Sequence, residues 1–313
     1  MESKKYSVVI PVFNSKKIIG TVVNKTTEFF KSKNLPYEII LINDGSEDGS
    51  WEIIKDLATS QKNVIAVNFL KNYGQHNAIL CGFHHVSGDF VITMDDDMQN
   101  PPEEIVHLIE KINQGYDVVF GRFRVKKHNL ARQLGSRIVG YLNTKIFRKP
   151  KDVQLSNFRI IRRDVIQRIL KYQTSFPYIP GLILMFSEKA GNVTVEHHTR
   201  EFGKSNYSLV RILKLVGTIL FNYSSFPIKF FGVVGAMIAL TSFIYGIIII
   251  LKRITTGTQV AGWATVVVLL SFLGGYIILM LALLGEYLSR IANRMSQNQS
   301  YTIKEVIQGE SQD

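Results

Sequence analysis

The sequence predicts an α/β protein with a mainly parallel, doubly wound sheet, followed by two membrane-spanning helices. Up to about residue 204, short apolar segments alternate with segments of helical period, which is typical of repeated β-α units. Beyond that point two long uncharged stretches follow one another, and no acidic residue occurs between Gly203 and Gly285. The chain of 313 residues is therefore expected to divide into an α/β domain at 1–204 and a membrane part.

The strands of the α/β domain are expected at short segments that are almost continuously apolar and rich in β-branched residues, which is typical of strands buried on both faces. These segments are Tyr6 to Phe13, Tyr37 to Asp44, Asn63 to Phe69, Asp89 to Asp95 and Asp117 to Gly121. Helical periodicity predicts helices at Lys16 to Lys33, Asp48 to Ser60 and Pro102 to Gln114. Ligands of such sheets bind at the carboxyl ends of the strands, so the polar residues there are candidates for chemistry. They are Asn14, Asp44, Asp95 to Asp97 and Arg122.

The membrane part contains two candidate spans. Phe230 to Leu251 is a run of 22 residues without a charge, and Ile254 to Gly285 is also uncharged. At a rise of 1.5 Å per residue, 22 helical residues reach about 33 Å, enough for a hydrocarbon core of about 30 Å. We expect spans at 228–251 and 264–285, joined by an external loop at 252–263. Basic residues flank the outer ends of this pair, so the positive-inside rule predicts cytoplasmic termini, although the loop itself holds two basic residues.

Two further segments flank the spans. Residues 205–227 either form an amphipathic helix lying on the bilayer or pack as an ordinary helix of the α/β domain, and the sequence leaves both open. Residues 286–313 are expected to form a cytoplasmic tail. The tail is polar after Gln297, and this last part is expected to be mobile.

Composition excludes several classes of protein. With one cysteine, Cys81, the chain has no disulfide framework and no cysteine-based zinc site. No apolar segment follows Met1, so we expect no signal peptide. The net charge of +12 is compatible with nucleic acid, but the excess is densest beside the apolar segments, where it meets anionic lipid. We therefore expect a lipid bilayer as partner and no nucleic acid.

Three successive carboxylates, Asp95, Asp96 and Asp97, follow the fourth expected strand. Adjacent carboxylates repel one another unless a cation compensates them. Asp95 and Asp97 occupy alternate positions and point to one side, and with the amide oxygen of Gln99 they offer the hard ligands that suit Mg²⁺ or Mn²⁺. The alternative is an acidic turn that caps the helix at Pro102, and the DxD pattern alone favours that alternative.

Four segments in order change this balance: SVVIPVFN, INDGSEDGS, NYGQHNAILCGF and TMDDDMQNPPEE. Together they resemble the successive signatures of family 2 inverting glycosyltransferases with the GT-A fold. Within that family the chain is similar to the polyprenyl-phosphate glycosyltransferases, which include dolichol-phosphate mannose synthases, bactoprenol glucosyltransferases and undecaprenyl-phosphate aminoarabinose transferases. The likeness continues in REFGKSNYS and LLGEYLSRI and so covers nearly the whole chain.

The resemblance implies a role for each candidate residue. Asp95, Asp97 and Gln99 are implied to bind the metal ion that contacts the donor diphosphate, and Asp97 is also implied to be catalytic. Nucleotide binding falls to Pro11, Phe13, Asn14, Asp44 and Asp96. Phosphate of the donor or of the lipid acceptor is expected at Arg122, Arg132, Arg200, Lys204 and Ser205. From the local sequence alone, Asp44 would be a turn residue and each arginine a solvated surface charge.

The chain departs from the pattern of its relatives at two places. Many relatives carry an aspartate where this chain has Asn157, and Asp152 is then the candidate catalytic residue, as base or acceptor-positioning group. In the segment Gly203 to Tyr207, relatives often have a lysine directly before the tyrosine, whereas this chain has its lysine at Lys204. Lys204 either makes the phosphate contact of that lysine, or the contact is lost.

The implied activity is inverting, metal-dependent transfer of one sugar from a nucleotide-sugar, with UDP as the expected nucleotide, to undecaprenyl phosphate. A phosphate monoester has a second pKa of about 6 and is already an anion, so base catalysis matters little. The product is a lipid-linked sugar for modification of the cell envelope. The resemblance further implies a multi-pass protein of the bacterial inner membrane and a homo-oligomer, for which a tetramer is expected.

Two other functions are compatible with parts of the sequence. A processive polysaccharide synthase of the same superfamily usually carries a QxxRW motif, but neither Trp51 nor Trp263 follows an arginine. A non-catalytic membrane scaffold would retain the nucleotide fold without chemistry, and the intact set of metal ligands argues against it.

Overall fold

The computed structural model describes residues 4–123, 130–172, 174, 176–196, 209–256, 262–295 and 300–309. The chain forms two compact units. One unit comprises Met1–Ile212 together with Asn298–Asp313, and the other comprises Leu213–Gln297.

The first unit is built on an eight-stranded sheet with the order β7-β5-β6-β4-β1-β2-β3-β8. Its strands are β1 (Tyr6–Val12), β2 (Tyr37–Asn43), β3 (Val64–Phe69), β4 (Phe90–Thr93), β5 (Val118–Phe123), β6 (Arg159–Arg162), β7 (Ala190–Val195) and β8 (Ile303–Gln308). The neighbours β4, β1, β2 and β3 run parallel, as do β5 and β7, while β6 and β8 run antiparallel to their neighbours. The predicted mainly parallel α/β sheet is confirmed, with all five expected strands in place.

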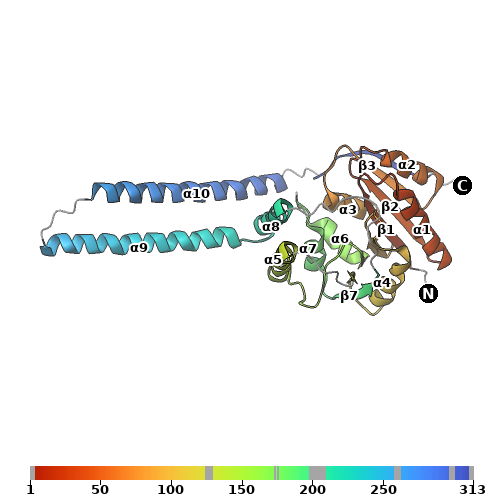
Figure 1. Ribbon diagram of the computed structural model, residues 1–313, viewed down its shortest axis with the longest axis horizontal. Helices are drawn as coiled ribbons and strands as arrows, with labels where there is room; N and C mark the ends of the chain where they lie inside the picture. Colours follow the sequence, from red (N-terminus) through yellow and green to blue (C-terminus); the bar gives the residue numbers. More distant parts are fainter. Residues whose placement is uncertain are drawn as a thin grey trace. The chain divides into compact units, whose positions relative to one another are not determined.

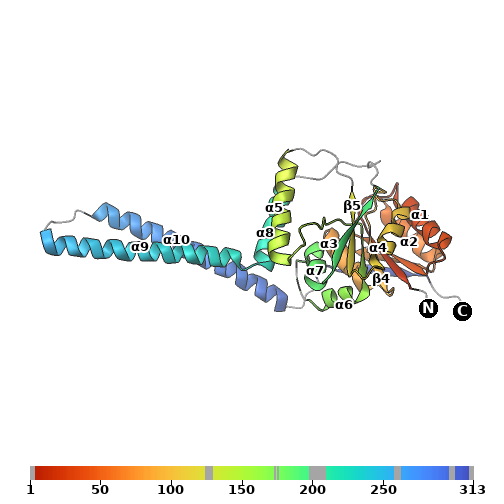
Figure 2. The ribbon, with the colours of Figure 1, turned by 90° about the horizontal axis from the view of Figure 1, so that it is seen from below.

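Helices cover both faces of this sheet (Figures 1 and 2). On one face, α1 (Ile19–Ser32), α2 (Ser50–Ser60) and α4 (Ile105–Ile112) share an apolar core with alternate residues of the central strands. The opposite face carries α3 (Gln75–His84), α6 (Arg163–Lys171) and α7 (Ile179–Phe186). Gly82 lets α3 lie close to the sheet, because a Cβ there would be 2.3 Å from a methyl group of Val9. The 3₁₀ turn η1 (Pro102–Glu104) precedes α4, and α5 (Leu130–Phe147) follows β5.

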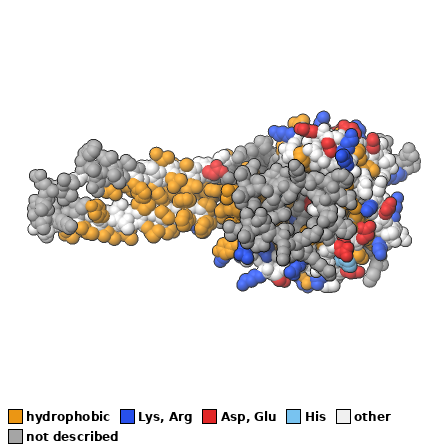
Figure 3. Space-filling view, viewed as in Figure 1, with side chains coloured by type: hydrophobic (Ala, Val, Ile, Leu, Met, Phe, Trp, Pro, Cys, Tyr) orange, Lys and Arg blue, Asp and Glu red, His pale blue; other side chains and the backbone are white. Residues whose placement is uncertain are grey.

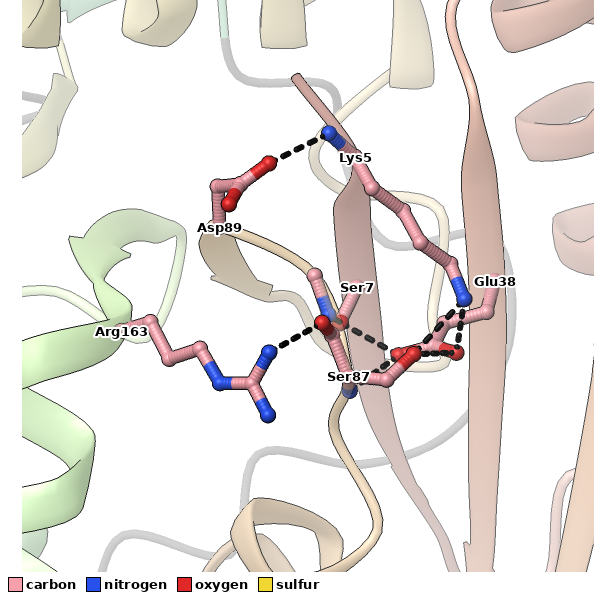
Figure 4. A network of polar contacts seen from close by, with 7 residues as sticks. Lys5, Ser7, Glu38, Ser87, Asp89 and Arg163 are labelled. Atoms are coloured by element: carbon pink, nitrogen blue, oxygen red, sulfur yellow. Dashed lines mark hydrogen bonds and ion pairs between the residues drawn. The ribbon is translucent and has the colours of Figure 1, made fainter. Parts of the chain in front are cut away.

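A polar network fastens the amino-terminal ends of β1 and β2, opposite the edge at which ligands of such sheets bind (Figure 4). The buried carboxylate of Glu38 accepts hydrogen bonds from Lys5 Nζ at 2.8 Å, Ser7 Oγ at 2.6 Å and Ser87 N at 2.6 Å. Burial acts to raise the pKa of Glu38, but these hydrogen bonds outweigh it and hold the pKa below its ordinary value. Arg163 of α6 donates to the carbonyl oxygen of Ser87 and so joins this network to the helical layer.

The second unit contains two long helices, α9 (Phe226–Thr256) and α10 (Trp263–Met295), and α8 (Leu209–Tyr223) precedes them. The windows Phe226–Ile248 and Phe272–Ser289 have mean hydropathies of 2.1 and 1.7, and none of either window is buried. Exposed apolar side chains cover these helices (Figure 3). A core helix of a soluble protein would be largely buried, so their length and exposure indicate a membrane protein, as the sequence predicts.

The expectation of a mobile tail is wrong for residues 303–308. They form β8, which pairs antiparallel with β3 from Ile65↔Gln308 to Phe69↔Ile303. Burial alternates along β8, with Ile303, Glu305 and Ile307 half-buried and the residues between them exposed. This period of two is typical of a strand with one face covered, and β8 lies at the end of the strand order. The segment IKEVIQ has no continuous apolar run, so the sequence pattern does not indicate a strand here.

Candidate active site

The candidate site lies at the edge where five neighbouring strands of the sheet, β6, β4, β1, β2 and β3, bring their connecting loops together. The parallel strands end there, and antiparallel β6 begins there. Four loops and the segment before β6 form the site, at residues 13–15, 44–46, 71–74, 94–100 and 156–157. The sheet order therefore gathers the polar residues that the sequence places at separate strand ends.

The loop at 94–100, called the acidic loop below, carries Asp95, Asp96 and Asp97. These carboxylates lie beyond the sheet, because β4 ends at Thr93. The Oδ1 atom of Asp95 accepts hydrogen bonds from Gln75 Nε2 at 2.6 Å and from Asn157 Nδ2 at 3.3 Å. The backbone N–H of Gln99 donates to Asp97 Oδ1 at 3.2 Å. Between them Met98 has a φ of 56°, a left-handed conformation that costs about 1–2 kcal/mol for a residue with a side chain. The strained turn keeps Gln99 beside Asp97, so the predicted metal ligands share one loop.

Asp96 contacts a different part of the site from Asp95. Its Oδ2 atom accepts the backbone N–H of Phe13 at 3.1 Å and the hydroxyl of Ser15. Asn14, between these two residues, has a φ of 54°, which asparagine tolerates better than most residues do. Asp96 therefore ties the acidic loop to the loop after β1, while Asp95 is held by α3 and by the segment before β6.

The loop after β1 presents an aromatic side chain. Phe13 is 48% exposed, which is unusual for phenylalanine, whereas Pro11 is buried within β1. Proline is tolerated at this place because pairing of β1 with β4 ends at Val9, so no ladder hydrogen bond on that side is lost. Phe13 thus offers a ring at the surface, and Pro11 shapes the strand beneath it.

Asp44 joins the loops that follow β2 and β3. It is only 3% exposed, and its carboxylate accepts the backbone N–H groups of Tyr73 at 2.7 Å and of Gly74 at 3.0 Å. Burial raises the pKa of Asp44 to about 6, although both hydrogen bonds act to lower it. Gly45 adopts a φ of +68°, and a Cβ there would lie 2.5 Å from the backbone nitrogen of Asn72. Asp44 is therefore more than a turn residue, because it closes the loop 71–74 over the sheet edge.

The charge of the acidic loop favours a bound cation. Burial raises the pKa of Asp95 to about 6, and the neighbouring Asp97 and Asp96 raise it further, against hydrogen bonds that lower it. No group of three or more His, Cys, Asp and Glu side chains suits a metal ion in the described part of the chain. Two carboxylates and one amide leave coordination positions for oxygens of a substrate, as a Mg²⁺ or Mn²⁺ site bound to a diphosphate requires. The residues present therefore fit the expected ion.

Mn²⁺ is expected to stabilise the protein strongly at about pH 7.5 and far less at about pH 5. Burial in the folded protein raises the pKa of Asp95 from 3.8 to about 6, so ionising Asp95 above that pH costs stability. A cation that binds only when Asp95 is ionised offsets this loss of stability. Saturating Mn²⁺ should raise the melting temperature by roughly 3–8 °C at the higher pH, measured by differential scanning fluorimetry. An equal shift at both pH values, or an unchanged shift in Asp95→Asn, would contradict this assignment.

The structure does not bring the other predicted site residues into described contact with the acidic loop. Asp152 is exposed on the turn between α5 and β6, where Lys149 is its charged neighbour, and no described contact links it to the acidic loop. Arg122 is exposed near the end of β5. Arg132 belongs to α5, but its side chain is outside the described residues, and so are the whole of Arg200, Lys204 and Ser205.

Several residues of the site do not follow from the metal and nucleotide motifs. Gln75 and Asn157 hold Asp95, and Ser15 holds Asp96. Arg159 is fully buried, and its Nε and Nη2 atoms have no hydrogen-bond partner among the described residues. Burial lowers the pKa of Arg159 to about 10, and the charge of Asp95 acts to raise it. The sequence NYGQH signals Gln75, but the contacts of Asn157 and Arg159 depend on the antiparallel insertion of β6.

Solved structures share this fold. Glucosyl-3-phosphoglycerate synthase from Mycobacterium tuberculosis, in complex with Mn²⁺, UDP and phosphoglyceric acid, matches with a TM-score of 0.50 and 18% identity. The match covers 70% of this chain and 76% of that chain. At this identity the likeness shows the fold alone.

Sequence comparison is more specific. The model of glycosyl transferase family 2 matches residues 7–170, which contain all the loops of the site. Undecaprenyl-phosphate 4-deoxy-4-formamido-L-arabinose transferase from Yersinia enterocolitica is 36% identical over 312 residues, covering 98% of this chain and 95% of that protein. The protein of the same name from Salmonella choleraesuis is also 36% identical, with the same coverage. The chain therefore belongs to glycosyl transferase family 2 and is a glycosyltransferase.

Proposed function

We propose that this protein transfers a single sugar from a nucleotide-sugar to undecaprenyl phosphate at the cytoplasmic face of the membrane. The observation that carries the proposal is the extent of the match to relatives named for that acceptor. It covers 98% of the chain and so includes both apolar helices as well as the α/β domain. A lipid acceptor also accounts for a soluble sugar-transfer fold joined to two membrane spans.

The chain connectivity supports one-sided placement of the catalytic domain. Residues 1–212, before the two long helices, and residues 298–313, after them, belong to the same compact unit, and β8 pairs with β3. A hairpin of two spans must then begin and end on the same side of the membrane. Basic residues at its outer ends, Lys229 and Arg290 among them, favour the cytoplasmic side.

In the proposed reaction, an acceptor phosphate oxygen attacks the anomeric carbon and forms the new C–O bond as the bond to the nucleoside diphosphate breaks. The nucleoside diphosphate leaves on the opposite face, so the configuration inverts. Asp95, Asp97 and Gln99 would hold Mg²⁺ or Mn²⁺, and the bound ion would supply positive charge to offset the charge of the leaving diphosphate. Phe13 and Asn14 would border the nucleoside, and Asp44 would bind its base.

The acceptor needs little help from a base, because a phosphate monoester is already an anion near neutral pH. Asn157 agrees with this view. Its amide donates to Asp95, whereas an aspartate at this position would add a further carboxylate to a crowded acidic loop. Asp152 remains our candidate for positioning the acceptor. Contacts to phosphate are assigned to Arg122, Arg132, Arg200, Lys204 and Ser205.

The proposal is tested by offering the full-length protein Mn²⁺, undecaprenyl phosphate and a panel of labelled nucleotide-sugars. We expect label from one UDP-sugar to enter the organic phase as a lipid carrying one sugar. Products with several sugars would instead indicate a processive synthase. Nucleotide binding without transfer from any donor would indicate a non-catalytic scaffold, and either result would reject the proposal.

A further inference from the structure

The chain that follows the second membrane helix contacts the loop of the candidate nucleotide site. Helix α10 ends at Met295, and Ser300 is the next residue that the structure describes. Its hydroxyl donates to Asn77 Oδ1 at 2.5 Å. Two residues later, the carbonyl oxygen of Thr302 accepts the backbone N–H of Leu70 at 3.0 Å. Residues 300–302 therefore lie against both ends of the segment that connects β3 to α3.

Tyr301, between these contacts, is packed into the same segment. It is 5% exposed, and its ring stacks on Phe69 with 4.9 Å between the centroids. Phe69 in turn makes an edge-on contact of 5.6 Å with Tyr73. The hydroxyl of Tyr301 is hydrogen-bonded to the thiol of Cys81 in α3. A single buried side chain thus bridges the end of β3 and the helix that follows it.

Both contact paths converge on the residues that hold the donor site. Asn77, the partner of Ser300, donates from Nδ2 to the carbonyl oxygen of Tyr73 at 2.8 Å. The backbone N–H groups of Tyr73 and Gly74 bind Asp44, and the side chain of Gln75 binds Asp95. The segment 73–75 therefore positions both Asp44, which is assigned to the nucleotide, and Asp95, which is assigned to the metal. Ser300 and Tyr301 contact Asn77 and Phe69, which in turn contact Tyr73 of this segment.

We propose that Ser300 and Tyr301 are positioning residues for the nucleoside-diphosphate donor, acting through the segment 73–75. The identity of the donor rests on the proposed function. A segment held in its binding conformation loses less conformational entropy when the ligand binds. Removing its supports should therefore weaken donor binding, while the chemical step and acceptor binding stay nearly unchanged.

A matched control lies on the same carboxy-terminal strand. Glu305 of β8 makes an ion pair with Lys55 of α2 at 3.1 Å, and no described hydrogen bond or ion pair joins either residue to the segment 73–75. Glu305→Gln removes one contact of the strand without altering the contacts of Ser300 and Tyr301 that hold the segment 73–75. Tyr301→Leu removes the ring and the hydroxyl but keeps an apolar side chain in the buried position, and Tyr301→Phe keeps the stacked ring.

The first measurement is hydrogen–deuterium exchange of the full-length protein without ligand. We expect the peptide that contains Tyr73 and Gly74 to exchange about ten-fold faster in Tyr301→Leu than in wild type. Ser300→Ala should show a smaller change in the same direction, and Glu305→Gln and Tyr301→Phe should resemble wild type. Unchanged exchange in Tyr301→Leu overturns the proposal, whatever ligand the site binds.

The second measurement is steady-state kinetics with the UDP-sugar and undecaprenyl phosphate. The KM for the donor should rise about ten-fold in Tyr301→Leu, with kcat and the acceptor KM within about two-fold of wild type. A fall in melting temperature with an unchanged donor KM would mean a purely structural role and would also overturn the proposal. Faster exchange in the loop of a protein whose wild type binds no nucleotide would instead reject the proposed function and leave the support of the loop standing.

Discussion

Asp97→Asn is expected to lower kcat for sugar transfer by about a hundred- to a thousand-fold. The substitution keeps the size of the side chain, but it removes one of the two carboxylates that are assigned to the cation. Without that charge the leaving diphosphate loses electrostatic stabilisation in the transition state. The rate is measured as label entering the organic phase at saturating donor, acceptor and Mn²⁺.

Asp56→Asn is the matched control for this substitution. Asp56 is exposed on α2, on the face of the sheet opposite α3, and the same chemical change there should leave kcat within about two-fold of wild type. A wild-type rate in Asp97→Asn would remove Asp97 from the metal site. Equal losses in both variants would show that the effect does not come from the acidic loop.

Asp44→Asn is expected to weaken binding of the nucleotide by about ten- to a hundred-fold. The carboxylate now accepts two backbone N–H groups, from Tyr73 and Gly74, and is also assigned to the base. An amide keeps only one acceptor oxygen, which the N–H groups of Tyr73 and Gly74 would then share, and it removes the negative charge. Isothermal titration calorimetry of UDP in the presence of Mn²⁺ measures the change.

Asp48→Asn separates a binding effect from a stability effect. Asp48 accepts the backbone N–H groups of Lys16 and Ser50 near the start of α2, and it has no described contact with the segment 73–75. We expect this variant to melt at a lower temperature and to bind UDP normally. If Asp44→Asn shows the same pattern, Asp44 has only a structural role.

Much of the fold could be predicted because the information is local. β1, β2 and β3 are buried along their whole length, so each appears in the sequence as a continuous apolar run. The two long helices also follow from the absence of charge. α9 and α10 extend beyond the expected spans because a helix continues past its apolar part while its backbone hydrogen bonds persist.

The rest depends on contacts between distant parts of the chain. Asn157 reaches Asp95 across 62 positions because β6 inserts antiparallel beside β4, an order that no local pattern specifies. The sequence pattern does not indicate β8 as a strand, because only its alternate residues are half-buried against the edge of the sheet. The role of Asp152 stays a prediction, since its exposed turn makes no described contact with the acidic loop.

The central claim is that a divalent cation held by Asp95, Asp97 and Gln99 joins this protein to the diphosphate of its donor. Calorimetric titration of UDP into the full-length protein, with Mn²⁺ and then with a chelator, tests it most directly. We predict binding that requires Mn²⁺ and is lost in Asp97→Asn. UDP binding of equal affinity in the chelator, or in Asp97→Asn with Mn²⁺ present, would contradict it.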